Sequence, residues 1–136
     1  MTKKEVISKV KSLNLPKNSY VGFGSGPLAA AGIRDANDID LLVSKEIYEK
    51  FKKSGWKILY KGPKDTPLVF DVFEAHKNWN FSEYKPTLQD LLNNAIEVDG
   101  VTFASIADVR KWKVASGRPK HMNDVGLIDS YIKNQT

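Results

Sequence analysis

The fold of this chain is decided by the stretch Asp38-Ile39-Asp40-Leu41-Leu42-Val43, which follows Val21-Gly22-Phe23-Gly24-Ser25-Gly26. Apart from its two aspartates, the first stretch is apolar and predicts a buried strand. Side chains alternate along a strand with a period of two, so Asp38 and Asp40 lie on one face. Two carboxylates side by side repel each other unless a cation lies between them, and oxygen ligands suit Mg²⁺, or Mn²⁺ in its place. The pair therefore predicts a divalent metal site.

The turn Gly24-Ser25-Gly26 follows a short strand predicted over Ser19–Phe23. Its backbone N–H groups are free to approach a phosphate, and Pro27 suits the first turn of a following helix. The alternative is a glycine-rich turn in which Ser25 is only the N-cap of that helix. Neither a Walker A loop nor a Gly-x-Gly-x-x-Gly fingerprint is present. By itself the turn favours the helix start, and only its place before the aspartates favours a phosphate site.

A third acid interrupts the apolar run Leu68-Val69-Phe70-Asp71-Val72-Phe73, part of a covered strand predicted over Leu68–Ala75. An unpaired charge inside such a strand would be destabilising by several kcal/mol, roughly. If this strand lies beside the aspartate strand, three carboxylates converge. Three acids can hold two Mg²⁺ ions about 3.5–4 Å apart, the arrangement used for in-line phosphoryl transfer. The alternative is a salt bridge from Asp71 to a nearby Lys or Arg.

The remaining pattern predicts an α/β (or α+β) fold with a mixed sheet, because strands and helices alternate early and helices dominate later. At 136 residues we expect a single domain, 1–136, with a core of about 1–84 and a mainly helical part of about 85–136. The other predicted strands are Trp56–Tyr60 and a strand or hairpin over Val98–Ala104. The predicted helices are Lys3–Leu13, Leu28–Ala31, Lys45–Lys53, Thr87–Ile96, Ser105–Ser116 and Met122–Lys133.

The composition is that of a soluble globular protein, with 41% hydrophobic and 27% charged residues. The absence of cysteine excludes disulfides and thiolate metal sites, and two histidines cannot build a typical structural zinc site. Since no run approaches membrane-spanning length and no apolar leader is present, we expect a cytoplasmic protein without a membrane partner. The net charge of +5 fits a phosphate-bearing partner, but scattered lysines also serve solubility.

Several conspicuous side chains have ordinary interpretations. We expect His76 at a strand end or on the surface, because no partner has the spacing of a second metal ligand. Packing against the sheet is favoured over base stacking for Trp79, Phe81 and Tyr84. Arg34 is expected to be a solvated loop residue, although it is close to the predicted metal-binding strand and could also contact a phosphate.

Taken together, the motifs resemble the signature of the DNA polymerase beta-like nucleotidyltransferase superfamily. These motifs are Gly24-Ser25, then after twelve residues Asp38-Ile39-Asp40-Leu41, and Asp71 on a later strand. The segment 109–120, followed by Asn123-Asp124-Val125, is similar to one in small nucleotidyltransferase-like proteins of bacteria and archaea. The resemblance covers about residues 20–128. It implies a nucleotidyltransferase-like mixed β-sheet flanked by helices, with a helical C-terminal part.

The resemblance also implies a set of site residues. Asp38 and Asp40 would be metal ligands, and Asp71 would complete the catalytic metal site and help activate the acceptor hydroxyl. Contacts to phosphate or substrate are carried over to Gly24, Ser25, Lys113, Arg118 and Lys120. His121 departs from the pattern, because many relatives have an acid at this position.

The implied activity moves an NMP from an NTP such as ATP to an acceptor hydroxyl on RNA, protein or a small molecule, releasing pyrophosphate. The first alternative is a catalytically silent nucleotide-binding or toxin–antitoxin module of the same fold, in which a partner protein or a homodimer completes the site. The second is a nucleic-acid-binding protein without NTP chemistry, which the basic charge alone suggests and which leaves the acids unexplained.

Overall fold

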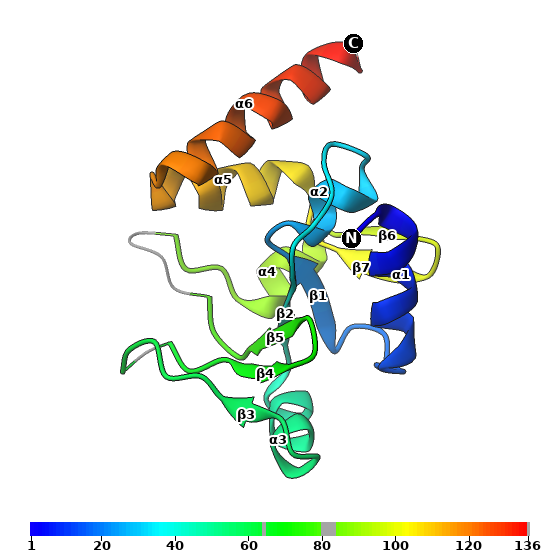
Figure 1. Cartoon of the computed structure of the whole chain (residues 1–136), viewed down its shortest axis with the longest axis vertical. Coiled ribbons are helices and arrows are strands. Elements are labelled where there is room, and N and C mark those ends of the chain that lie inside the picture. Colours follow the sequence, from blue (N-terminus) through cyan, green and yellow to red (C-terminus); the bar gives the residue numbers. More distant parts are fainter. Residues whose placement is uncertain (64, 80–83, 136) are drawn as a thin grey trace.

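The computed structural model describes residues 1–63, 65–79 and 84–135 (Figure 1). Within this part of the chain, seven strands form one mixed sheet in the order β3-β4-β5-β2-β1-β7-β6. The strands are β1 (Tyr20–Phe23), β2 (Ile39–Val43), β3 (Lys57–Ile58), β4 (Leu68–Phe70), β5 (Phe73–His76), β6 (Ile96–Val98) and β7 (Val101–Phe103). The helices are α1 (Lys3–Ser12), α2 (Gly26–Ala30), α3 (Lys45–Lys53), α4 (Leu88–Asn93), α5 (Ile106–Ser116) and α6 (Pro119–Asn134). This mixed sheet with flanking helices confirms the predicted fold class.

Strand β2, which carries the aspartate motif, lies in the middle of the sheet. It pairs antiparallel with β1 and parallel with β5, and β1 in turn pairs parallel with β7. The outer strands β3, β4 and β6 join through antiparallel pairs. Both neighbours of β2 thus reach the aspartate motif, as the predicted site requires.

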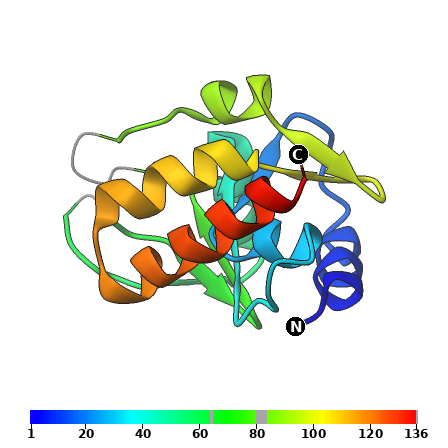
Figure 2. The same cartoon turned by 90° about the horizontal axis from the view of Figure 1, so that it is seen from above.

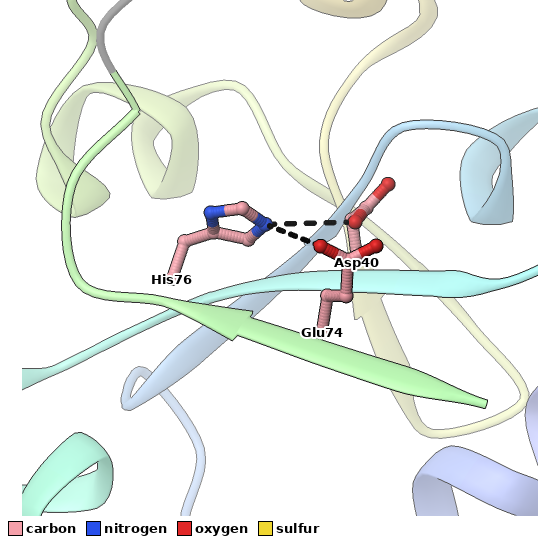
Figure 3. A group of neighbouring side chains, drawn as sticks. All are labelled: Asp40, Glu74 and His76. Atoms are coloured by element: carbon pink, nitrogen blue, oxygen red, sulfur yellow. Dashed lines mark ion pairs between the residues drawn. The ribbon is translucent and has the colours of Figure 1, made fainter. Parts of the chain in front are cut away.

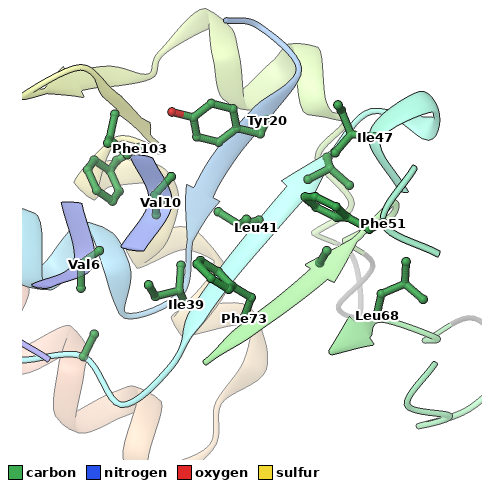
Figure 4. Close-up of a cluster of buried hydrophobic side chains, with 14 of the residues drawn as sticks. Val6, Val10, Tyr20, Ile39, Leu41, Ile47, Phe51, Leu68, Phe73 and Phe103 are labelled. Atoms are coloured by element: carbon green, nitrogen blue, oxygen red, sulfur yellow. The ribbon is translucent and has the colours of Figure 1, made fainter. Parts of the chain in front are cut away.

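The alternation of side chains along β2 divides the core between the two faces of the sheet. Ile39, Leu41 and Val43 are buried on one face, together with side chains of α1 and α3 (Figure 4). Leu42 belongs to the cluster on the other face, which α4, α5 and α6 cover. Because Asp40 has the same parity as Leu42, its side chain lies on the face of α5 and α6. These two helices form a hairpin over that face (Figure 2).

Local capping signals determine where most of the helices begin. Thr2 caps α1 and forms a reciprocal capping box with Glu5, while Ser44 and Ser105 cap α3 and α5 through their hydroxyl groups. Gly117 ends α5 in the left-handed conformation. Helix α6 begins at Pro119, three residues earlier than predicted. The reason is that proline suits the first helical position and does not interrupt the helix there.

The strand predicted over Leu68–Ala75 is wrong, because the chain reverses in its middle. Strand β4 ends at Phe70 and β5 begins at Phe73, and the two pair antiparallel as a hairpin. Asp71 lies in the connection with φ of 53°, a left-handed conformation that Asp tolerates better than most residues. The hairpin predicted around Asp99-Gly100 is confirmed as β6 and β7.

The aromatic segment after β5 packs as predicted where it is described. Trp79 is buried edge-on against Phe23 and Trp112, and Tyr84 packs partly buried on the same cluster. Phe81 lies outside the described residues. No helix in the described part of the chain combines the length and apolar character needed to span a membrane.

Candidate functional site

A cleft of about 430 Å³ opens where β2 and β5 meet the α5–α6 hairpin. It contains most of the residues that the sequence singled out. Those that line it are Gly24, Ser25, Asp38, Asp40, Lys113, Arg118 and Lys120. Segments from both halves of the chain therefore meet at one place, and Asp71 is the predicted site residue that does not line this cleft.

Asp71 lies away from the other two aspartates, so the prediction that it completes their site is corrected. Its carboxylate forms an ion pair with Lys9 Nζ of α1 at 2.6 Å, and it is about two-fifths exposed. Helix α1 covers the face of the sheet opposite to Asp40. The physical reason is the β4–β5 turn, because Asp71 connects two strands rather than standing within one. The alternative interpretation, a salt bridge to a nearby lysine, is the observed one.

Glu74 supplies the third carboxylate in place of Asp71. In the parallel pairing of β2 with β5, Asp40 lies directly opposite Glu74. Adjacent strands are about 4.8 Å apart, so the two side chains leave the same face as neighbours. The sequence signal was present but overlooked, since Glu74 and His76 have the same i, i+2 spacing as Asp38 and Asp40.

The three carboxylates share a crowded electrostatic environment. Burial raises the pKa of Asp38, and the nearby charges of Asp40 and Glu74 raise it further, while Lys120 and Lys61 oppose this effect. Lys61 Nζ binds Glu74 Oε1 at 2.7 Å. Burial disfavours the charge of Lys61, but its hydrogen bond to Glu74 and the charges of Glu74, Asp65 and Asp40 together outweigh this and raise the pKa of the lysine. Negative charge in the cleft thus exceeds what this one lysine neutralises.

His76 joins this carboxylate group, contrary to the expectation that it has no partner at ligand spacing. It ends β5 as predicted for a strand-end residue, but it is buried. Its Nε2 lies 3.6 Å from Asp40 Oδ1 and 4.0 Å from Glu74 Oε1 (Figure 3). One ligand atom from each of these three residues falls within 4.8 Å of the others. Such a set has the donor types and closeness of a metal site.

Gly24 forms the wall of the cleft beside Asp40. Its φ is +67°, and a Cβ at this position would overlap Asp40 Oδ2 and lie 3.2 Å from Asp40 Cγ. Only glycine satisfies both the left-handed backbone and this close approach. The backbone of the turn is thus held against the carboxylate group.

Ser25 connects the turn to the aspartate strand. Its hydroxyl donates a 3.2 Å hydrogen bond to the carbonyl of Asp38, and it makes no capping bond to α2. Ser25 therefore occupies the N-cap position of α2, as the alternative interpretation predicted, but its side chain does not cap the helix. The side chain instead fixes the distance between the turn and the start of β2.

Opposite the carboxylates, a buried ion-pair network links the cleft to α6. Asp124 accepts two hydrogen bonds from Arg34, at 2.7 and 2.9 Å, and one from Lys113 at 2.9 Å. Burial alone would raise the pKa of Asp124, but these cations lower it to about 2. Burial lowers the pKa of Lys113, and its bond to Asp124 counteracts part of this shift. Lys113 is thus committed to Asp124, and Arg34 is not the solvated loop residue that was expected.

The rim of the cleft carries the freer basic groups. Arg118 and Lys120 are exposed and line the opening at the start of α6. His121, beside them, is buried and hydrogen-bonded to Ser116 Oγ. Burial, followed by the charges of Lys113, Lys120 and Arg118, lowers the pKa of His121 to about 4. The imidazole is therefore neutral at pH 7 and adds no charge to the basic rim.

Comparison with known proteins identifies structures with a similar fold but no similar sequence. No protein-family model matches the chain, and no curated protein matches it in sequence. Two solved structures of ANT(2")-Ia are similar. The crystal structure in complex with adenylyl-2"-tobramycin has a TM-score of 0.56 at 15% identity, covering 93% of this chain and 85% of that one. The solution structure of the same antibiotic-resistance factor has a TM-score of 0.56 at 14% identity, covering 95% and 81%.

The similarity spans nearly the whole chain and includes both the sheet and the C-terminal helices. ANT(2")-Ia is a nucleotidyltransferase, and the fold is one that supports nucleotidyl transfer. At this level of identity the likeness concerns the fold alone. The chain thus shares its fold with these two ANT(2")-Ia structures, and that fold is consistent with the one that the sequence resemblance implied.

Proposed function

We propose that this protein is a metal-dependent nucleotidyltransferase that moves an NMP from an NTP to an acceptor hydroxyl, with release of pyrophosphate. One observation carries the proposal: Asp40 lies opposite Glu74 in a cleft that also contains Asp38, on a nucleotidyltransferase fold. The charges of Asp40 and Glu74 disfavour the ionised form of Asp38, so three carboxylates in one cleft repel one another, and Lys61 forms its ion pair with Glu74. The repulsion among these carboxylates is explained if the protein binds a metal cation between them as part of its function.

The residues present fit a divalent metal. Asp40 and Glu74 offer oxygen ligands of the kind that Mg²⁺ and Mn²⁺ prefer, and their ligand atoms lie within 4.8 Å of each other and of His76. Asp38 stands outside this close group but near it, since burial and then the charges of Asp40 and Glu74 raise the pKa of Asp38. When bound, such an ion neutralises phosphate charge and lowers the pKa of an attacking hydroxyl. In this proposal Glu74 takes the place that the sequence assigned to Asp71.

The remaining cleft residues would hold the triphosphate. Gly24 brings backbone close to Asp40, and the Ser25 hydroxyl lies at the start of β2. Arg118 and Lys120, exposed at the rim, can pair with phosphate oxygens. Lys113 contributes by positioning Asp124 and by placing positive charge within reach of Asp40.

The acceptor is the open part of the proposal. The related structure carries an adenylyl group on tobramycin, so ANT(2")-Ia uses a small hydroxylated molecule. A cleft of about 430 Å³ lies within the range of small-molecule sites, about 300–1,000 Å³. We therefore propose a small molecule before RNA or protein as the acceptor. A partner protein or a homodimer could enlarge the site.

One observation favours a second candidate, a nucleotide-binding module that does not transfer. Lys61 lies 2.7 Å from Glu74 and supplies a cation from the protein itself. In such a module, part of the carboxylate charge is neutralised without metal. The module would bind nucleotide but release no pyrophosphate.

The test measures binding and transfer separately. Calorimetry of ATP, GTP, CTP and UTP with Mg²⁺ or Mn²⁺ is compared among the unmodified protein, Asp38→Asn and Asp40→Asn. The proposal expects metal-dependent binding that both substitutions abolish, and unchanged affinity in both would refute it. Pyrophosphate release in the presence of hydroxylated acceptors distinguishes the enzyme from the silent module.

A further inference from the structure

His76 is placed where a ligand nitrogen would complete the carboxylate group. It follows Glu74 by two residues on β5, so both side chains leave the sheet on the face of Asp40. The side chain is 8% exposed. Figure 3 shows the ring edge directed between the two carboxylates, one from each strand.

The nitrogen that points into the group lacks a hydrogen-bond partner. Among the described residues, His76 Nε2 is buried and finds neither donor nor acceptor at bonding distance. Its nearest oxygens, at 3.6 Å on Asp40 and 4.0 Å on Glu74, lie beyond a normal hydrogen bond. Two ligands of one ion, each about 2.1 Å from it, lie at most about 4 Å apart. The observed separations are those of groups around an ion.

The surroundings of the ring present Nε2 rather than Nδ1 to the carboxylates. Nδ1 faces Asp65 Oδ1 at 3.9 Å on the outer side. The ring also packs edge-on against Trp79, with centroids 4.6 Å apart. A carboxylate behind a histidine is the usual arrangement that orients a metal-binding imidazole. Asp65 lies on that side of the ring, although at 3.9 Å it is beyond hydrogen-bond distance.

We infer that His76 is a metal ligand, and that the site formed by Asp40, Glu74 and His76 prefers a transition ion of the Mn²⁺ type to Mg²⁺. This inference rests on the proposed metal-dependent function and specifies its ion. Mg²⁺ takes oxygen ligands, whereas an imidazole nitrogen favours first-row transition metals. A site in which His76 supplies nitrogen in place of one oxygen donor therefore favours Mn²⁺ over Mg²⁺ more than an all-oxygen site does.

The experiment uses Mn²⁺ alone, without nucleotide, on the full chain. Binding is followed by the electron paramagnetic resonance signal of free Mn²⁺, and nitrogen coordination by electron spin echo envelope modulation. The chain has two histidines, so His76→Gln and His121→Gln form a matched pair in one cleft. Incorporation of ¹⁵N-histidine into the unmodified protein supplies a test that needs no substitution.

The inference expects histidine nitrogen modulation in the unmodified protein and in His121→Gln, but not in His76→Gln. Affinity for Mn²⁺ falls about tenfold or more in His76→Gln, while affinity for Mg²⁺ changes much less. Bound Mn²⁺ without nitrogen modulation, in a protein that retains metal-dependent NTP binding, overturns the inference and leaves the proposed function intact. Absence of both Mn²⁺ binding and metal-dependent NTP binding overturns both.

Discussion

Asp40 and Glu74 lie directly opposite each other on the neighbouring parallel strands β2 and β5. This pairing brings together two acids that are 34 residues apart in the sequence. It assigns the third carboxylate of the site to Glu74, whereas Asp71 pairs with Lys9 beyond the turn.

The first prediction separates these two acids. Glu74→Gln should lower nucleotidyl transfer by about 100-fold, because loss of a metal-site charge removes several kcal/mol of transition-state stabilisation. Asp71→Asn is the control, because it breaks an exposed ion pair worth roughly 0–1 kcal/mol. Both are measured by steady-state pyrophosphate release. A larger loss of activity in Asp71→Asn than in Glu74→Gln would show that Asp71, and not Glu74, belongs to the site.

The second prediction concerns the glycine beside Asp40. Gly24→Ala should abolish metal-dependent nucleotide binding, since the new Cβ overlaps the Asp40 carboxylate. Gly32→Ala is its matched control: Gly32 also has positive φ, at +75°, but nothing lies within 4 Å of its added Cβ. Each substitution should cost about 1–2 kcal/mol from the left-handed backbone. Calorimetric titration should therefore distinguish the two variants, and equal nucleotide affinities would contradict the prediction.

The third prediction tests the buried network on α6. Asp124→Asn should destabilise the fold by about 3 kcal/mol at pH 7, because Arg34 and Lys113 then lose their shared carboxylate. Asp129→Asn removes a similar two-bond pair with Arg110, but on the surface, where solvent screens the charges, and should cost much less. Urea unfolding at pH 7 measures both. A similar loss of stability in Asp124→Asn and Asp129→Asn would show that burial does not make the Asp124 ion pairs stronger than the exposed one.

The pH dependence of the same network has a definite sign. The pKa of Asp124 falls from 3.8 to about 2 on folding, so its ionised form stabilises the native state above pH 4. This contribution, about 2 kcal/mol, should disappear as the pH falls from 4 to 2. The slope of unfolding free energy in this window should be smaller in Asp124→Asn. The same slope in Asp124→Asn and in the unmodified protein would show that a group other than Asp124 causes the loss of stability in acid.

The fourth prediction concerns His121 and a higher pH window. Its pKa falls from 6.5 to about 4 on folding, so the native state binds fewer protons than the unfolded chain between these values. Stability should therefore decrease by about 3 kcal/mol as the pH falls from 6.5 to 4. Titration of the His121 ring protons by NMR should give a midpoint near 4. His121→Gln should lose the slope, and a midpoint near 6.5 would contradict the prediction.

Much of the fold was accessible from local patterns. Asp40 on β2, the starts of α1 and α3, and the β6–β7 hairpin all depend on residues close in sequence. Spacing and capping act within a few residues, so these predictions needed no knowledge of the sheet. The resemblance in motif order then indicated the fold that the structural comparison confirmed.

The candidate site depended on contacts that no local pattern contains. The third acid of the cleft is Glu74 and not the predicted Asp71, because Asp71 lies in the turn between β4 and β5. In an apolar run, the sequence of a two-residue connection cannot be distinguished from that of a strand interior. Lys113 was expected at a phosphate but pairs with Asp124, since its burial makes an internal counter-charge necessary. His76 lies beside Asp40 only because β5 pairs with β2, and its proposed function as a metal ligand depends on that pairing.

The sequence by itself determined that a buried strand carries Asp40 on the face opposite to Ile39 and Leu41, because the period of two is a property of the extended backbone. Asp38, predicted in the same strand, lies just before β2 begins at Ile39. The sequence also placed Gly24 and Ser25 before that strand, at the spacing on which the resemblance to nucleotidyltransferases rests. Only the tertiary structure decided that Glu74 and His76 stand beside Asp40, because strand order and register arise from the packing of the whole sheet.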